Sequence, residues 1–205
     1  MEPPQPPDLE PNQRQLLELL RAQGIAGRSV LEVGCGKGRL HRRLLDEGAT
    51  SVVGVDFIRS WLAEAERLAR ERGHGERVTY VAGDFLQLAE RLEPADLILL
   101  DKVVHCYQEP ERLVRRSAQL TRSLYALSSP RSLWWFRSLL QGAGFLMRFL
   151  PTRWRTSFTP PETLRAWVRE EGFELIARAE TRLWHTELYA RRGAPPPAES
   201  VLGGE

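Results

Sequence analysis

A glycine-rich segment, Val30–Gly38 (VLEVGCGKG), is the part of the sequence whose residue types and spacing most directly indicate ligand chemistry. Gly34, Gly36 and Gly38 occupy alternate positions after an apolar run, so the backbone can turn tightly and approach a ligand without interference from a Cβ atom. The helix predicted to follow presents its N-terminus to the same crevice. Taken alone, the segment is also consistent with a plain tight turn between a strand and a helix.

Two acidic residues follow the glycine segment at spacings that suit a nucleoside. Asp56 is expected at the end of the second strand, about twenty residues on, where a carboxylate can accept hydrogen bonds from both ribose hydroxyls. Asp84, in the sequence AGDF, is expected at the end of the third strand, placed to accept from an adenine amino group. Phe57 and Phe85 follow these acids and are candidates to flank the adenine ring. One acid at a strand end is commonly a helix N-cap, but two acids on successive strands favour a nucleoside site.

The elements that must position these residues are short apolar runs alternating with helical patterns, which together indicate a mostly parallel sheet covered by helices on both faces. The runs predicted as strands are Ser29–Val33, Ser51–Val55, Arg77–Val81, Ala95–Leu100, Ser123–Leu127, Phe173–Ala179 and Leu183–Arg191. The patterns predicted as helices are Asn12–Gln23, Leu40–Glu47, Ser60–Arg72 (Trp61, Ala65 and Leu68 on one face), Pro110–Leu120 and Pro161–Glu171.

The last two predicted strands are separated by Glu180–Arg182 alone, which is too short for a helical crossover. They are therefore expected to pair antiparallel. The expected fold class is α/β, a doubly wound sheet of about seven strands, mostly parallel, that ends in an antiparallel C-terminal hairpin.

The ends of the chain differ in composition from its middle. Residues 1–11 and 193–205 are rich in proline, glycine and acidic residues and are expected to be disordered, which leaves one domain over residues 12–192. Within that domain, residues 132–155 form an insert that concentrates tryptophan, phenylalanine and arginine. Its composition suits a substrate lid, a helix on an anionic membrane surface, or a helix that packs on the sheet with its arginines reaching outward.

Charge is distributed unevenly, although the net charge is only +2. Residues 1–111 carry 14 Lys and Arg against 19 Asp and Glu, whereas residues 112–192 carry 15 against 6. A basic half of this kind suits an anionic partner, such as a carboxylate, a phosphate or a lipid headgroup. The alternative is a set of individually solvated arginines.

In these motifs the sequence resembles the class I, Rossmann-like, seven-stranded methyltransferases that use S-adenosylmethionine. VLEVGCGKG, VVGVDF, VTYVAGDF and ADLILLDKVVHCY match the family's motifs in order and spacing. The resemblance implies S-adenosyl-L-methionine as methyl donor and S-adenosyl-L-homocysteine as product. It also assigns donor contacts: Glu32, Gly34 and Gly36 to the methionine and ribose portion, Asp56 to the ribose, Asp84 and Phe85 to the adenine, and Asp101 to the methionine end.

An enzyme that uses NAD is the competing interpretation of the glycine segment. Its fingerprint is Gly-x-Gly-x-x-Gly, whereas Gly38 here comes one residue earlier. That interpretation also gives no role to the Gly-Asp pair after the third strand. The spacing therefore favours a methyl donor.

His105, just past the fourth strand in DKVVHCY, is the candidate general base. Open α/β sheets place their sites at this carboxyl edge, and the ordinary pKa of a histidine suits proton removal from a hydroxyl or amine. Packing at a strand end is the alternative. Tyr107 is a second catalytic candidate, with a rim aromatic as its alternative, and Cys35 and Cys106 are interpreted as small packing residues.

A narrower resemblance links the chain to the methyltransferases that act on magnesium protoporphyrin propionates. It rests on LLDKVVHCY, on the SSPRS stretch after the fifth strand and on the aromatic final strand. It implies that His105 lies beside a carboxylate acceptor. This chain has a shorter N-terminal segment and an additional residue, Cys106, before Tyr107.

The composition and motifs also limit the classes of function. Two cysteines give no zinc spacing and no disulfide framework, and no metal is expected. The N-terminus lacks the apolar core of a signal peptide, and no run of 18 apolar residues exists, so a cytoplasmic protein is expected. We expect a methyltransferase acting at oxygen on a small or amphipathic, anionic acceptor, with no nucleic-acid partner. The alternatives are a catalytically silent donor-binding subunit and an RNA or protein methyltransferase; the oligomeric state is open.

Overall fold

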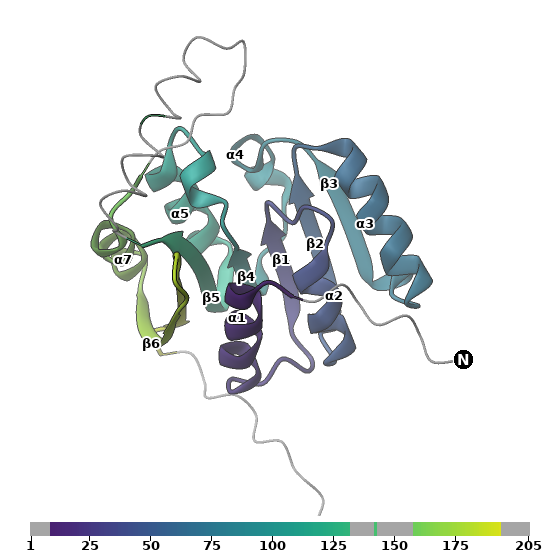
Figure 1. Cartoon of the computed structure of the whole chain (residues 1–205), viewed down its shortest axis with the longest axis horizontal. Helices are drawn as coiled ribbons and strands as arrows, with labels where there is room; N and C mark the ends of the chain where they lie inside the picture. Colours follow the sequence, from purple (N-terminus) through teal and green to yellow (C-terminus); the bar gives the residue numbers. More distant parts are fainter. Residues whose placement is uncertain (1–8, 132–141, 143–157, 194–205) are drawn as a thin grey trace, which may run out of the picture.

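The computed structural model describes residues 9–131, 142 and 158–193. Its described part is built around one seven-stranded sheet with the strand order β3-β2-β1-β4-β5-β7-β6, which Figure 1 shows from β3 on one side to β6 on the other. The strands are β1 (Ser29–Val33), β2 (Ser51–Asp56), β3 (Val78–Ala82), β4 (Ala95–Leu100), β5 (Thr121–Pro130), β6 (Phe173–Glu180) and β7 (Trp184–Arg191).

Helices connect the parallel strands and cover both faces of the sheet (Figure 1). The α-helices are α1 (Pro11–Arg21), α2 (Arg39–Asp46), α3 (Arg59–Glu71), α4 (Phe85–Leu88), α5 (Pro110–Gln119) and α7 (Pro161–Glu170). Three single turns of 3₁₀ helix lie at Gly75–Arg77, Ala89–Arg91 and Val104–Cys106.

The core has two halves, one on each face of the sheet. Leucines of α1 and α2 pack on one face, and apolar side chains of α4, α5 and α7 pack on the other. Strands buried on both faces need almost continuous apolar sequence, which explains why β1 (SVLEV) and β4 (ADLILL) are mostly apolar. The rigid sheet therefore holds the strand ends, and the loops that follow them, at fixed positions.

The strand pairing confirms the predicted fold class. The sheet is parallel from β3 through β5, and the last two strands pair antiparallel with each other and with β5. The chain adds β2 and β3 on one side of β1 and then returns to add β4 on the other side, so β1 is the switch point of the sheet. In open α/β sheets a ligand crevice forms at this switch point, outside the carboxyl ends of the strands.

Three sequence predictions need correction. Disorder over residues 1–11 is wrong for residues 9–11, because Leu9 packs in the core and α1 begins at Pro11, a position that tolerates proline because its N–H would be unpaired. β5 extends to Pro130, beyond the predicted Leu127, because its polar end pairs with β7. Trp61 is exposed rather than packed.

Among the described residues, no helix is both long and apolar enough to cross a membrane. The insert at residues 132–155 lies outside the described residues apart from Gly142, so the three interpretations of it stay predictions.

Candidate functional site

The loop after β1 has the backbone that its glycines permit. Gly34, Gly36 and Gly38 have φ angles of 72°, 54° and 68°, in the left-handed region that favours glycine. A Cβ atom at Gly34 would lie 2.6 Å from a methyl group of Val103. The loop after β1 and the loop after β4 therefore touch directly, and only glycine fits at this contact.

The loop's backbone donors are largely satisfied within the fold. The N–H groups of Gly34 and Cys35 both donate to the carbonyl of Val55, at 2.8 and 3.1 Å, and that of Gly38 donates to the carbonyl of Cys35. A diphosphate cradle needs backbone N–H groups directed at the ligand. In this loop most of these N–H groups are already bonded within the fold, so few remain to bind a diphosphate. The arrangement therefore suits a methyl donor, which has no diphosphate, better than a dinucleotide.

Asp56, the last residue of β2, has its carboxylate fixed on both sides. Oδ2 accepts from the N–H of Gly36 at 2.8 Å, and Oδ1 accepts from the N–H of Ile58 at 2.9 Å. A carboxylate offers about four lone-pair positions, so each oxygen can accept a second hydrogen bond. Asp56 is thus oriented and able to bind a pair of hydroxyls.

Aromatic side chains border a small hollow beside Asp56. The hollow is lined by Gly34, Val55, Asp56, Phe57, Gly83, Val103, Cys106 and Tyr107. Phe57 is 39% exposed and Trp61 is 41% exposed, and a Cβ atom at Gly36 would be 3.9 Å from the Trp61 ring. Sequence reasoning missed Trp61 as a site candidate because its spacing also fits a packed helix face.

Asp84 and Phe85 differ from the expectation for an adenine contact. Asp84 is the N-cap of α4 and accepts from the N–H of Leu86 at 3.0 Å, the alternative role of a strand-end acid. The Phe85 ring is fully buried in the core below α4. The first turn of α4 directs this ring into the core, and its contact with an adenine stays a prediction.

Tyr107 lines the same hollow as Asp56. Its ring centroid is 6.0 Å from that of Phe57, and its hydroxyl is 3.4 Å from the backbone N–H of Phe85. Burial, followed by the charge of Asp84, raises the pKa of the Tyr107 hydroxyl. A phenol that stays protonated in the hollow beside Asp56 is poorly suited to the catalytic role predicted for it.

Asp101, at the end of β4, is held by three side chains. It accepts from Asn12 Nδ2 at 2.7 Å, from Gln13 Nε2 at 2.9 Å and from the hydroxyl of Ser128. Burial raises the pKa of the Asp101 carboxyl. The first turn of α1 thus contacts the carboxyl edge of β4, a contact across about ninety residues that no local motif could indicate.

Lys102 has φ 55°, which makes it the single residue other than glycine with positive φ in the described part of the chain. Its backbone N–H donates to the Ser128 hydroxyl at 2.9 Å, and its ammonium pairs with Glu10 and lies 5.0 Å from the centre of the Trp184 ring. Such strain concentrates at functional sites.

His105 lies in the 3₁₀ turn after β4, with its ring centroid 5.4 Å from that of Trp184. Its Nδ1 atom is buried and has no hydrogen-bond partner among the described residues. Burial, and to a smaller extent the Lys102 ammonium, lowers the pKa of His105 to about 4. The imidazole is therefore neutral near pH 7, as a general base must be.

Glu32, predicted to line the donor, lies under the glycine loop. Its carboxylate is buried and is 2.5 Å from Nδ1 of His41, a residue of α2 that sequence reasoning did not single out.

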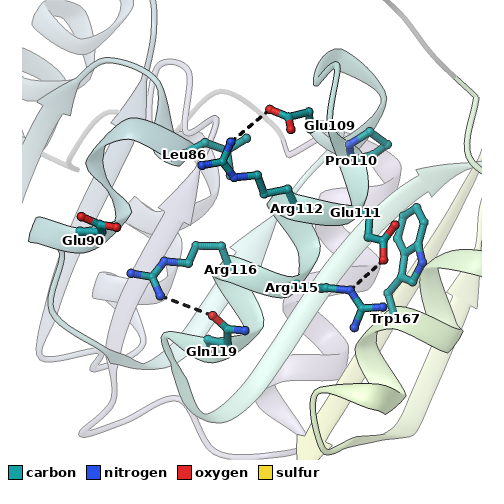
Figure 2. Close-up of a pocket in the computed structure, with 10 residues that line it drawn as sticks. All are labelled: Leu86, Glu90, Glu109, Pro110, Glu111, Arg112, Arg115, Arg116, Gln119 and Trp167. Carbon is teal, nitrogen blue, oxygen red and sulfur yellow. Dashed lines mark hydrogen bonds and ion pairs between the residues drawn. The ribbon is translucent and has the colours of Figure 1, made fainter.

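A separate hollow of about 640 Å³ lies between α4, α5 and α7, and Figure 2 shows the side chains around it. Its arginines are largely engaged: Arg112 pairs with Glu109, and Arg115 with Glu111, Glu170 and Glu171. None of the predicted site residues lines it.

No group of three or more His, Cys, Asp or Glu that could hold a metal ion occurs in the part of the chain that the structure describes.

Comparisons with known proteins agree with this geometry. Residues 30–124 match the family described as "Methyltransferase domain". The chain is 28% identical over 156 residues to the ubiquinone biosynthesis O-methyltransferase of Methylococcus capsulatus, and 29% identical over 177 residues to that of Xylella fastidiosa. These alignments cover 74% and 84% of this chain and 65% and 71% of the relatives, so the chain spans about two thirds of their length.

A similar fold occurs in magnesium protoporphyrin IX methyltransferase from Synechocystis PCC 6803 with bound S-adenosylhomocysteine. The TM-score is 0.69 at 24% identity, over 88% of this chain and 81% of that one. The strand order, the glycine loop and the match over residues 30–124 together identify a class I S-adenosylmethionine-dependent methyltransferase domain in this chain. The cofactor of this class is S-adenosylmethionine.

Proposed function

We propose that the chain transfers a methyl group to an oxygen atom of a small, amphipathic acceptor that binds beside His105. The observation that carries the proposal is the buried Nδ1 atom of His105 at the carboxyl edge of the sheet, which has no hydrogen-bond partner in the described ranges 9–131, 142 and 158–193. A buried polar atom without a hydrogen bond lowers the stability of the fold unless a ligand or a water molecule supplies the hydrogen bond. An acceptor hydroxyl is a suitable partner.

The donor side of the proposed site is the hollow beside Asp56. Asp56 would hold the ribose hydroxyls, Phe57 and Trp61 would supply aromatic surface, and the loop at Gly34 and Gly36 would shape the crevice. These residues fit such a molecule because the Asp56 carboxylate is oriented by two backbone N–H groups. When bound, S-adenosylmethionine supplies a methyl group already activated by its sulfonium charge.

On the acceptor side, three side chains have complementary roles. Neutral His105 can take the proton of a hydroxyl. The Lys102 ammonium would stabilise the oxyanion that forms, and the Trp184 ring offers an apolar face to the body of the acceptor. The O-methyltransferase names of the relatives support oxygen over nitrogen.

A turnover assay with methyl-labelled donor and a panel of phenols, catechols, carboxylates and amines tests the proposal. We expect labelled methyl ether or ester from at least one oxygen acceptor, and loss of turnover in His105→Ala with S-adenosylhomocysteine affinity retained. Labelled product from amines alone would overturn the choice of oxygen.

A donor-binding subunit without activity of its own is the second candidate. The hydrogen bonds of Asp101 and the ion pair of Lys102 support this candidate. Both charged groups are already bonded within the fold, as in a residue with a structural role. S-adenosylhomocysteine binding without turnover of any acceptor, including those in a cell extract, would favour this candidate.

A further inference from the structure

Three polar side chains, Glu32 and His41, which are buried, and Tyr80, which is partly buried, form a row beneath the glycine loop. Nδ1 of His41 lies 2.5 Å from the Glu32 carboxylate, and Nε2 lies 2.9 Å from the hydroxyl of Tyr80. The His41 side chain is completely buried, and Glu32 is 3% exposed. A neutral imidazole satisfies both contacts when its Nδ1–H donates to Glu32 and its Nε2 accepts from Tyr80. The row joins β1, α2 and β3.

Glycines make room for this row. A Cβ atom at Gly38 would lie 2.4 Å from Nε2 of His41, so the imidazole packs directly against the loop backbone. A Cβ atom at Gly54 would lie 2.9 Å from the sulfur of Cys35 and 3.1 Å from the Tyr80 ring. The position of His41 is therefore tied to the shape of the loop, and the loop in turn contacts Asp56 through Gly36.

A carboxylate this deeply buried is stable in its charged form only with partners. Burial raises the pKa of Glu32, and the hydrogen bond from His41 opposes that rise. The other charges that act on it are Asp101, which raises the pKa, and Arg42, which lowers it. His41 is the residue in direct hydrogen-bond contact with the Glu32 carboxylate.

We propose that His41 is a positioning residue for donor binding: it holds the Glu32 carboxylate charged and in place beneath the glycine loop. The inference rests on the proposed donor site. A methyl donor carries an α-ammonium and a sulfonium, and the charges of Glu32, Asp56 and Asp101 together make this end of the crevice negative. Without His41, the buried Glu32 would take up a proton, and part of that negative field would be lost.

The test compares His41→Leu with His74→Leu as a matched control. His74 is also buried and pairs with a carboxylate, Asp46 at 2.7 Å, but Asp46 is the last residue of α2, at the opposite end from the loop. Calorimetric Kd values for S-adenosylhomocysteine are measured between pH 6 and pH 8, with thermal unfolding of each variant.

We expect the wild type and His74→Leu to bind with similar Kd across this pH range. His41→Leu should bind about tenfold more weakly at pH 8, the size of one lost charged hydrogen bond, and more weakly still at pH 6 as Glu32 becomes protonated. Glu32→Gln should show the same weakened binding at every pH. A wild-type Kd and a flat pH profile in His41→Leu would overturn the inference.

His41→Asn keeps the test decisive if His41→Leu does not fold. Asparagine can place its amide near the Nδ1 position, so it retains the donor to Glu32 and loses the contact with Tyr80. We expect its Kd to stay within about threefold of wild type and to be independent of pH, whereas a tenfold loss would contradict the proposal. Failure of the wild type to bind S-adenosylhomocysteine would instead refute the donor site itself.

Discussion

The backbone N–H of Gly36 donates a 2.8 Å hydrogen bond to Oδ2 of Asp56, which links the loop after β1 to the end of β2. The two strands are neighbours in a parallel sheet, with Val33 opposite Val55. The register of the sheet thus places the glycine turn and the carboxylate side by side, and the hydrogen bond fixes the carboxylate toward the crevice.

Asp56→Ala should reduce S-adenosylhomocysteine affinity by at least about 100-fold, because two hydrogen bonds to a charged group are lost and each contributes about 1.5–3 kcal/mol. Calorimetry measures the affinity, and circular dichroism checks that the fold survives. Glu66→Ala is the control, because this exposed side chain of α3 pairs with Arg70 of the same helix. Unchanged affinity in Asp56→Ala would refute the donor assignment.

The contrasting environments of Phe57 and Phe85 give a paired prediction. Phe85→Ala should lower the free energy of unfolding by about 3–5 kcal/mol, since its ring is fully buried in the core. Phe57→Ala should leave stability nearly unchanged and weaken S-adenosylhomocysteine binding about three- to tenfold through lost aromatic contact. Denaturant unfolding and calorimetry on both variants separate the two roles. The reverse pattern would contradict the placement of these rings.

Local patterns in the sequence were sufficient for the fold. The apolar runs predicted each strand, and Asp56 lies where its distance from the glycine loop placed it. The direction of the Phe85 ring could not be predicted from the sequence, because it depends on where α4 begins.

Contacts between distant segments were beyond sequence reasoning. Asn12 of α1 contacts Asp101 after β4, and His41 of α2 contacts both Glu32 and Tyr80. Asn12 and His41 lie in ordinary helical sequence, so no local pattern marks these contacts. Such contacts depend on the three-dimensional packing of α1 and α2 on the sheet. Trp61 was missed for a related reason, since periodicity does not distinguish the edge of a packed helix face from its centre.

Asn12→Ala tests the support of Asp101 by α1. The substitution removes one of three donors to a largely buried carboxylate, so the free energy of unfolding should fall by about 1–3 kcal/mol. Denaturant unfolding at pH 7 measures the change. Gln15→Ala, on the same helix, removes an exposed hydrogen bond to the Glu180 carbonyl and should change stability by less than about 1 kcal/mol. Equal changes in the free energy of unfolding in the two variants would show that the Asn12–Asp101 hydrogen bond stabilises the fold no more than an exposed one.

The pH dependence of turnover tests His105 most directly. A general base acts only in its neutral form, so activity should be full above the His105 pKa of about 4 and should fall as the pH drops through that value. A histidine with an ordinary pKa would already lose activity near pH 6.5. The measurement is kcat/KM against pH, with circular dichroism at each pH to confirm that the protein is folded.

Three variants complete the experiment. Lys102→Met removes the second cause of the lowered pKa, so the acidic limb of the profile should move to higher pH.

His105→Ala should lower kcat by about 10²-fold or more while S-adenosylhomocysteine affinity stays within about twofold. Tyr107→Phe keeps the ring and should retain most of the turnover, because the Tyr107 hydroxyl lies on the donor side of the crevice. Full activity in His105→Ala, or a larger loss in Tyr107→Phe than in His105→Ala, would reassign the base.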